Sequence, residues 1–209
     1  MEKPYVFINC AMSLDGKIAS QSGKQIRISC DEDIKRMYEL RNRADAVLVG
    51  INTVLSDNPK LTVKSKYVNN PSQPIRIVLD TKCKTPKDSL VVNNATKTYL
   101  IVGKKCEKKY KENVEIIETK TKNGIIDLHD FLNKIHKKGI RTLMVEGGST
   151  VITNFLKEKL ADDMYIYVGS MLIGGKNSPS LLKEDISKIN LNLVETKKIG
   201  MGVLLHYKI

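Results

Sequence analysis

The stretch Thr142–Thr150, TLMVEGGST, decides the fold, because it passes from an apolar strand through a glycine turn into a helix. Glycine lets the backbone turn sharply and approach a ligand closely. The first turn of a helix offers free N–H groups and the positive end of a dipole. Together with the hydroxyls of Ser149 and Thr150, these features predict a phosphate site. A tight turn with a serine cap explains the same residues structurally.

Glu146 stands between this buried strand and the glycines. A carboxylate beside a phosphate site is expected to bind something other than the phosphate, such as a hydroxyl or amine donor. We therefore expect the turn to face two chemical groups rather than one.

Apolar segments of strand length alternate with helical patterns along the rest of the chain. We expect strands at residues 5–11, 46–49, 75–79, 98–102, 114–118, 141–145 and 164–168, helices at about 31–43, 128–138 and 148–160, and a hairpin over 191–209. Ser29-x-x-Glu32 predicts a capping box for the first helix. The alternation predicts an α/β fold with a mostly parallel central sheet, flanked by helices and closed by a C-terminal antiparallel hairpin. With no long linker, we expect one domain over 1–209.

Composition narrows the classes of protein. The formal net charge is +12, from 35 Lys and Arg against 23 Asp and Glu, but aromatic residues make up only 5% and tryptophan is absent. The lysines are scattered, which favours a solvated basic surface over a nucleic-acid interface. No apolar run reaches the roughly 18 residues of a membrane span. With no signal-peptide pattern at the N-terminus, we expect a cytoplasmic protein.

The four cysteines, at positions 10, 30, 83 and 106, lack metal-ligand spacing. We expect no metal site and, in a cytoplasmic chain, no disulfide. The histidines are isolated from one another and form no nucleophile–base pair in the sequence. Hydride transfer needs no such pair, because a cofactor carries the chemistry. The sequence thus fits a reductase better than a hydrolase.

Polar residues follow two other predicted strands. Asn52, Thr53 and Asp57 come after the strand at 46–49, at the strand end where open α/β sheets bind ligands. Helix capping explains the same residues. Asp80 ends the strand at 75–79, where an acid takes ribose hydroxyls or else stabilises a turn. Arg41 either clamps a substrate phosphate or complements a helix dipole.

In this order and spacing, the motifs resemble the pyrimidine reductase family of riboflavin biosynthesis. The resemblance covers residues 4–207 and rests on SLDGKIA (13–19), Leu40-Arg41, DAVLVGINTVLSDNPKLT (45–62), PIRIVLD (74–80), VEGG (145–148) and LIGG (172–175). It implies a dihydrofolate-reductase-like fold, a homodimer, and reduction of a ribosylamino side chain of a pyrimidine 5′-phosphate to ribitylamino with NADPH. The zinc deaminase signature that precedes the reductase in bacterial relatives is not found here, so the stand-alone archaeal type, acting on the 2,5-diamino compound, is implied.

The resemblance also assigns roles to individual positions. It places the cofactor against Ala11, Arg27, Thr53, Asp57, Thr81, Gly147, Gly148, Ser149 and Thr150, and Asp80 is expected there as the strand-end acid. It places the substrate against Gln25, Arg41, Leu61, Lys64 and Glu146, with Arg41 and Lys64 near its phosphate. Asp57 is the candidate for handling the proton in the reaction.

Several alternatives stay open. Relatives often carry an aromatic residue where Arg27 stands and an arginine where Lys64 stands, and lysine gives no bidentate clamp. Arg27 could meet a 2′-phosphate, so the sequence leaves NADH possible beside NADPH. The deaminated uracil compound, or a dihydrofolate or pterin, is the alternative substrate. A nucleic-acid-binding protein is the rival that rests on net charge alone.

Overall fold

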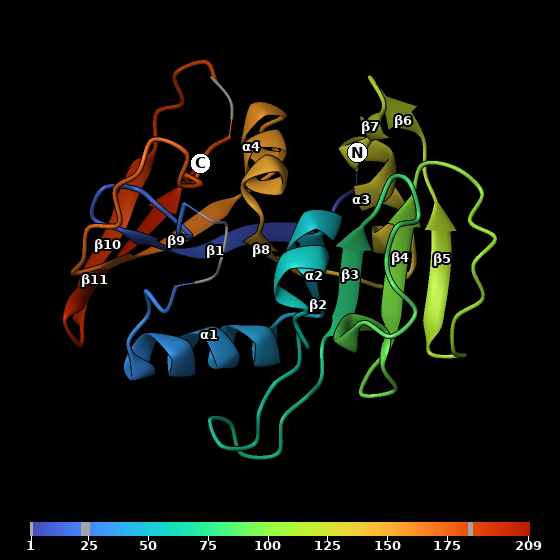
Figure 1. Cartoon of the computed structure of the whole chain (residues 1–209), viewed down its shortest axis with the longest axis horizontal. Helices are drawn as coiled ribbons and strands as arrows, with labels where there is room; N and C mark the ends of the chain where they lie inside the picture. Colours follow the sequence, from blue (N-terminus) through green and yellow to red (C-terminus); the bar gives the residue numbers. More distant parts are fainter. Residues whose placement is uncertain (1, 22–25, 184–185) are drawn as a thin grey trace.

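The computed structural model describes residues 2–21, 26–183 and 186–209. Its main sheet has the strand order β10 (Asn192–Ile199), β11 (Gly202–Lys208), β9 (Asp163–Gly169), β1 (Tyr5–Ser13), β8 (Thr142–Gly147), β2 (Ala46–Gly50), β3 (Ile75–Leu79), β4 (Thr98–Val102) and β5 (Val114–Glu118) (Figure 1). The strands from β9 to β5 run parallel, whereas β11 and β10 are antiparallel to their neighbours. The predicted α/β fold with a closing hairpin is therefore confirmed.

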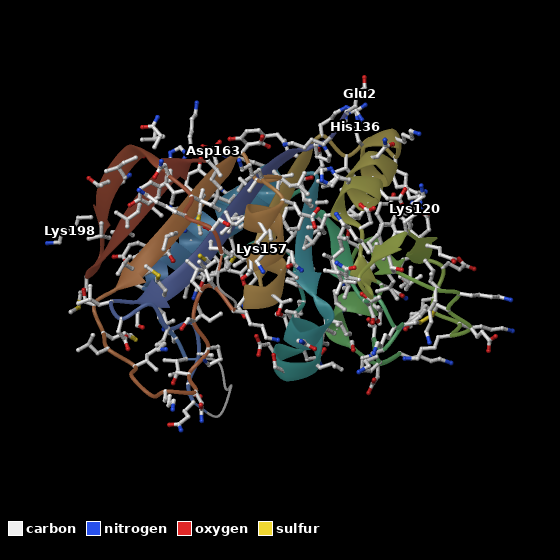
Figure 2. The ribbon with its side chains drawn as sticks, turned by 90° about the horizontal axis from the view of Figure 1, so that it is seen from above. Glu2, Lys120, His136, Lys157, Asp163 and Lys198 are labelled. Atoms are coloured by element: carbon white, nitrogen blue, oxygen red, sulfur yellow. A yellow bond between two sulfur atoms is a disulfide. The ribbon has the colours of Figure 1, made fainter. Side chains whose placement is uncertain are left out.

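Helices cover both faces of this sheet. On one face, α3 (Leu128–Lys137) and α4 (Ser149–Lys157) pack on Ile8 and the residues in register with it. On the other, α1 (Asp31–Arg43) and α2 (Ile51–Asp57) pack on Phe7 and its neighbours. Figure 1 shows these helices on the two sides of the sheet, and Figure 2 gives the view from above. Successive strand residues point to opposite faces, so the continuous apolar runs in the sequence supply both cores.

Short elements escaped prediction. The hairpin of β6 (Thr121–Lys122) and β7 (Ile125–Ile126) and the 3₁₀ turn η1 (Leu90–Val92) are too short to show a period in the sequence. The predicted capping box is wrong. Helix α1 has Cys30 as its N-cap without a side-chain cap, and the Ser29 hydroxyl donates to Asp33 Oδ2 at 2.5 Å instead.

Arg76 is the largest fully buried side chain, on the second residue of β3. Its guanidinium donates to Thr98 Oγ1, to Asn93 Oδ1 and to the carbonyls of Leu90, Asn93 and Thr96, at 2.5–3.1 Å. Burial lowers its pKa to about 10. These bonds fasten the segment 90–97 to the amino end of the sheet.

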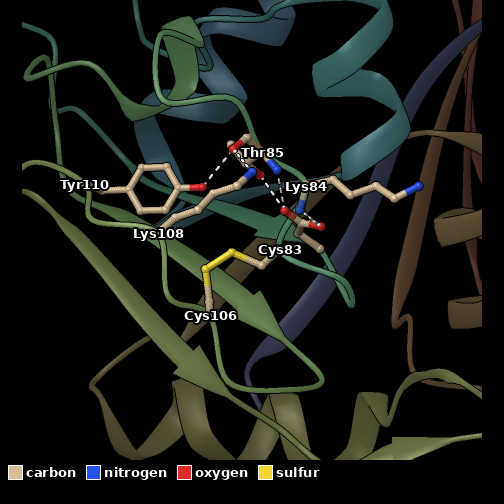
Figure 3. The surroundings of a disulfide bond; sticks show 7 residues. Cys83, Lys84, Thr85, Cys106, Lys108 and Tyr110 are labelled. Atoms are coloured by element: carbon tan, nitrogen blue, oxygen red, sulfur yellow. Dashed lines mark hydrogen bonds between the residues drawn. A yellow bond between two sulfur atoms is a disulfide. The ribbon is translucent and has the colours of Figure 1, made fainter.

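The expectation of no disulfide is wrong. Cys83 and Cys106 are joined, with their Cα atoms 5.7 Å apart (Figure 3). Each cysteine stands four residues beyond the end of its strand, Cys83 after β3 and Cys106 after β4. Since β3 and β4 are parallel neighbours, equal offsets bring the two loops together. Sequence spacing alone, with the two cysteines 23 positions apart, does not reveal this.

Membrane-spanning helices and metal-binding clusters are both absent from residues 2–21, 26–183 and 186–209. Within these ranges, no helix combines the length and the apolar character needed to cross a bilayer. Nor do three or more His, Cys, Asp or Glu side chains gather there in a way that could hold a metal ion.

Candidate active site

The turn between β8 and α4 lies at the carboxyl edge of the sheet. Gly147 has φ +138°, a conformation that side chains rarely adopt, and its peptide bond to Gly148 is cis. The Gly148 N–H donates to Thr53 Oγ1 at 3.1 Å. A Cβ on Gly148 would lie only 3.2 Å from that oxygen. The backbone conformation therefore favours glycine at position 147, a side chain at 148 would crowd Thr53, and the turn is fastened to α2.

The first turn of α4 offers donors to a ligand. Its N-cap is Gly148, which has no side chain to accept bonds from the following N–H groups. Anions bind where such groups and the positive end of the helix dipole point into open space. The space is present, because Gly148, Ser149 and Thr150 line a cavity of about 520 Å³.

We call this the first cavity. It is lined by residues from the ends of β2, β3 and β8, from α4 and from the segment 176–183: Gly50, Ile51, Asn52, Thr53, Leu79, Thr81, Ile125, Ile126, Leu128, Gly148, Ser149, Thr150, Val151, Asn154, Lys176, Asn177, Ser178, Pro179, Ser180, Leu182 and Lys183. Within the described part of the chain, its wall contains two lysines and no carboxylate. Apolar side chains on one side and polar groups near the helix end suit a ligand that is part flat ring and part anion.

A second cavity of about 720 Å³ lies on the other side of the turn. Its wall includes Ala11, Arg27, Asp57, Glu146 and Gly147. The two cavities share Asn52, Thr53, Gly148, Ser149 and Pro179. The two cavities therefore adjoin each other at the glycine turn.

Glu146 is held by Arg41 at the wall of the second cavity. Arg41 Nε and Nη2 donate to the two carboxylate oxygens, each at 2.6 Å, and Nη1 donates to the Thr62 carbonyl at 3.0 Å. Both side chains are 12% exposed. Burial opposes the charge on Arg41, but the charge and hydrogen bonds of Glu146 outweigh it and raise the Arg41 pKa. Such a bidentate pair is strong and fixes orientation.

Tyr38 connects Arg41 to Lys64. The guanidinium carbon of Arg41 lies 5.3 Å from the centre of the Tyr38 ring, and Lys64 Nζ lies 5.6 Å from it. Tyr38 also stacks on Tyr67, with 4.8 Å between ring centres. The fold thus brings together two cations that are 23 positions apart in the sequence, around an aromatic ring that sequence reasoning missed.

Asp80 has a structural role instead of facing either cavity. Its side chain is fully buried, and its carboxylate accepts from the Lys84 N–H at 2.8 Å and from the N–H and hydroxyl of Thr85, both at 2.7 Å. Its cofactor assignment is therefore corrected in favour of the turn that the sequence left open. Its neighbour Thr81 does line the first cavity.

Three further predicted positions lie elsewhere. Leu61 is buried in the core beside α1 and α2 and lines neither cavity. Arg27 lines the second cavity and not the first, and pairs with Asp31. Gln25 lies outside the described residues.

The motif at 13–19 is explained by a loop contact. The Asp15 carboxylate accepts from the Ser13 hydroxyl at 2.6 Å and from the N–H groups of Ile173 and Gly174 at 3.0 and 2.7 Å. These bonds, led by the Ser13 bond, lower the Asp15 pKa to about 2. Asp15 thus joins two motifs that are far apart in the sequence and steadies the loop leading into the first cavity.

Comparisons with known proteins agree with this geometry. The model of the RibD C-terminal domain matches residues 4–205. The 2,5-diamino-6-ribosylamino-4(3H)-pyrimidinone 5′-phosphate reductase of Archaeoglobus fulgidus is 38% identical, over 96% of this chain and 95% of that protein.

Two solved structures extend the comparison. The bifunctional diaminohydroxyphosphoribosylaminopyrimidine deaminase/5-amino-6-(5-phosphoribosylamino)uracil reductase of Thermotoga maritima superposes with a TM-score of 0.84 at 26% identity, over 99% of this chain. This chain spans 56% of that protein's length. Dihydrofolate reductase of Enterococcus faecalis superposes with a TM-score of 0.57 at 13% identity, which concerns the fold alone and agrees with the predicted dihydrofolate-reductase-like architecture.

Proposed function

Since this chain belongs to the family of the RibD C-terminal domain, we propose that it reduces the ribosylamino group of 2,5-diamino-6-(ribosylamino)-4(3H)-pyrimidinone 5′-phosphate to ribitylamino in riboflavin biosynthesis. The observation that carries the proposal is the meeting of two cavities over one glycine turn. A reductase must hold two ligands in contact, and this edge of the sheet has room for both. We propose that the whole chain acts as one reductase domain.

We propose that the first cavity takes a nicotinamide dinucleotide. The N-terminus of α4, with Thr53, Ser149 and Thr150 around it, suits the pyrophosphate. Thr81 suits the ribose at the far end, and Ala11 and Gly147 in the second cavity suit the nicotinamide end. When bound, this group supplies the hydride.

We propose that NADPH is preferred to NADH. Recognition of a free ribose 2′-hydroxyl normally uses a carboxylate. Among the described residues, the wall of the first cavity has no carboxylate, and the strand-end acid Asp80 is occupied by its own turn. Lys176 and Lys183 give the cavity positive charge that suits an extra phosphate. Arg27 stays a second candidate for that phosphate, from the second cavity.

We propose that the substrate occupies the second cavity. Glu146, fixed by Arg41, presents a carboxylate to its amino and hydroxyl donors. Arg41 and Lys64, which both lie close to the Tyr38 ring and outside the lining of the cavity itself, supply positive charge for the 5′-phosphate. Gln25 remains a substrate position by resemblance alone, whereas the burial of Leu61 in the core removes it from the proposed site. Asp57, on the same wall at the end of α2, handles the proton as the ribosylamine opens and C1′ is reduced.

We propose that the protein is a homodimer. Strand β10 forms the end of the sheet, and seven of its eight residues are exposed. Leu193, Val194 and Val203 expose 51%, 49% and 40% of their surface there. An exposed edge with apolar side chains is a site for pairing with another chain. Figure 2 shows Lys198 projecting from this outer edge.

A direct assay tests the function. Purified protein is mixed with NADPH or NADH and with the diamino compound, the deaminated uracil compound or dihydrofolate, while the absorbance of the reduced nicotinamide is followed. We expect oxidation of NADPH with the diamino compound at the highest kcat/KM. Faster turnover of the uracil compound would change the substrate assignment. Oxidation with dihydrofolate alone, or with none of the three, contradicts the proposal.

A further inference from the structure

The disulfide joins two loops at the rim of the first cavity. Cys83 lies in the turn after β3 and Cys106 in the segment after β4, next to Lys84, Lys108 and Tyr110 (Figure 3). Neither cysteine contributes to the walls of the two cavities. The disulfide therefore lies outside the proposed active site, in loops that lead from residues of its wall such as Thr81.

The two loops control the position of Thr81. The Gly103 N–H donates to the Thr81 carbonyl at 3.1 Å, and a Cβ on Gly103 would lie 2.9 Å from Thr81 Cγ2. Gly103 thus packs directly behind a residue of the cavity wall. Cys83 is two positions from Thr81 and Cys106 is three positions from Gly103. A bond between the cysteines fixes how closely these two loops approach.

Other contacts hold the turn itself together. Asp80 accepts three bonds from Lys84 and Thr85, and the Tyr110 hydroxyl and Lys108 Nζ donate to the Thr85 carbonyl at 2.7 and 3.0 Å. Breaking the disulfide would leave these bonds in place. The expected consequence is a small loosening between the loops rather than local unfolding.

The surroundings favour exchange at this pair. In the sequence, Lys82 and Lys84 flank Cys83, and Cys106 is preceded by Lys104 and Lys105 and followed by Glu107, so lysines outnumber carboxylates next to the pair. Nearby positive charge stabilises a thiolate, which is the reactive form of cysteine. Cys106 is partly exposed, whereas Cys83 is buried. The thiolate of Cys106 is thus the accessible attacking group.

We propose that Cys83 and Cys106 form a reversible redox switch that sets the affinity of the first cavity for its dinucleotide. The Cys106 thiolate attacks a small-molecule disulfide and expels one of its halves as a thiol. Cys83 then displaces the second half, so that two electrons and two protons pass from the cysteines to the small disulfide. A dithiol reverses both steps. The disulfide form holds Thr81 in place and binds the dinucleotide more tightly. The proposal rests on the proposed function for the identity of that ligand.

Binding of NADPH without pyrimidine substrate tests the switch. Protein is treated with glutathione disulfide or with dithiothreitol, the reagent is removed, and NADPH fluorescence is titrated. Ordering of a side chain or loop contact on binding costs about 0.5–1.5 kcal/mol, so we expect roughly two- to tenfold weaker binding after reduction. C83S and C106S should bind like reduced protein under both treatments. C30S, which removes a thiol that belongs neither to the pair nor to either cavity wall, should respond like the unaltered chain.

Thiol counting measures the redox state of the cysteines, and hydrogen exchange measures the two loops independently of NADPH binding. The oxidised protein should show two thiols fewer than the reduced protein, and residues 80–85 and 103–111 should exchange more slowly. Equal thiol counts, or equal affinity in the two states, overturn the switch. If NADPH binds in neither state, the dinucleotide proposal fails. In that case, slower hydrogen exchange of residues 80–85 and 103–111 in the oxidised protein would still support redox control of these loops. Equal exchange in the two states would overturn it.

Discussion

At the scale of single residues, the site depends on carboxylates with different surroundings. Asp57 is exposed at the end of α2 and faces the second cavity, whereas Glu146 is nearly buried and neutralised by Arg41. A bidentate pair with arginine fixes the position of a carboxylate. These surroundings support the proposal that Asp57 handles the proton and that Glu146 orients the substrate.

Replacement of Asp57 tests the first role. We expect Asp57→Asn to lower kcat more than about tenfold, because the amide has the same shape but cannot exchange the proton. The thermal midpoint should stay the same, since the side chain is at the surface. Asp88→Asn, an exposed carboxylate away from both cavities, serves as the control. An unchanged kcat in Asp57→Asn removes the residue from the chemistry.

The Arg41–Glu146 pair gives a second prediction at this scale. Glu146→Gln or Arg41→Met leaves one buried charge without its partner and should lower the free energy of unfolding by roughly 3–5 kcal/mol. The double variant Arg41→Met/Glu146→Leu removes both charges, so its loss should be well below the sum of the single losses. Urea denaturation measures all three. Additive losses would mean that the two side chains act independently.

Arg76 gives a prediction about stability without catalysis. Arg76→Met removes the five hydrogen bonds of the buried guanidinium, although Asn113 Nδ2 still donates to the Asn93 and Thr96 carbonyls and the Asn93 N–H to the Leu90 carbonyl. We expect a loss of roughly 3 kcal/mol in the free energy of unfolding. Arg43→Met, at the exposed end of α1, should change stability by less than about 0.5 kcal/mol. The kcat of folded Arg76→Met should be normal, because Arg76 lies at the amino edge of the sheet. A fall in kcat without a fall in stability would contradict this structural role.

At the scale of elements, the site is assembled by loops that hold each other. The turn after β8 is tied to α2 through Thr53, and the loop after β1 is tied to residues 173–174 through Asp15. Loops at the carboxyl ends of parallel strands are the variable part of such folds. Here a few side chain–backbone bonds convert them into a fixed frame.

The Asp15 contact predicts a pH dependence. Its folded-state pKa of about 2 lies below the ordinary 3.8, so the carboxylate stabilises the loop above pH 3.8 and loses this effect as the pH falls from 3.8 to about 2. Hydrogen exchange of the Ile173 and Gly174 amides should stay slow at pH 5. Asp15→Asn should make both amides exchange faster at neutral pH. Equal protection in Asp15→Asn and the unaltered chain would show that the carboxylate does not hold this loop.

At the scale of the whole molecule, the sequence predicts what is local and misses what is set by topology. Apolar runs located the central strands, such as β2 and β4, because all of their residues are buried. The pairing of Arg41 with Glu146 spans 105 positions, and no local pattern reveals it. The role of Asp80 could not be predicted for the same reason. An acid at the end of a strand can face a ligand or its own turn, and only the three-dimensional structure distinguishes the two. The disulfide becomes predictable once β3 and β4 are known to be neighbours.

The edge of the sheet supplies the last prediction. If two copies of β10 pair antiparallel about Thr196, Glu195 of each copy opposes Lys197 of the other, which places opposite charges across the interface. Light scattering after size exclusion should therefore give twice the chain mass of 23.5 kDa. Glu195→Lys should weaken the dimer by placing like charges opposite each other, and Glu195→Lys/Lys197→Glu should restore it. A monomeric mass at all protein concentrations would contradict the dimer. If both variants dimerise as tightly as the unaltered chain, the interface lies on another surface.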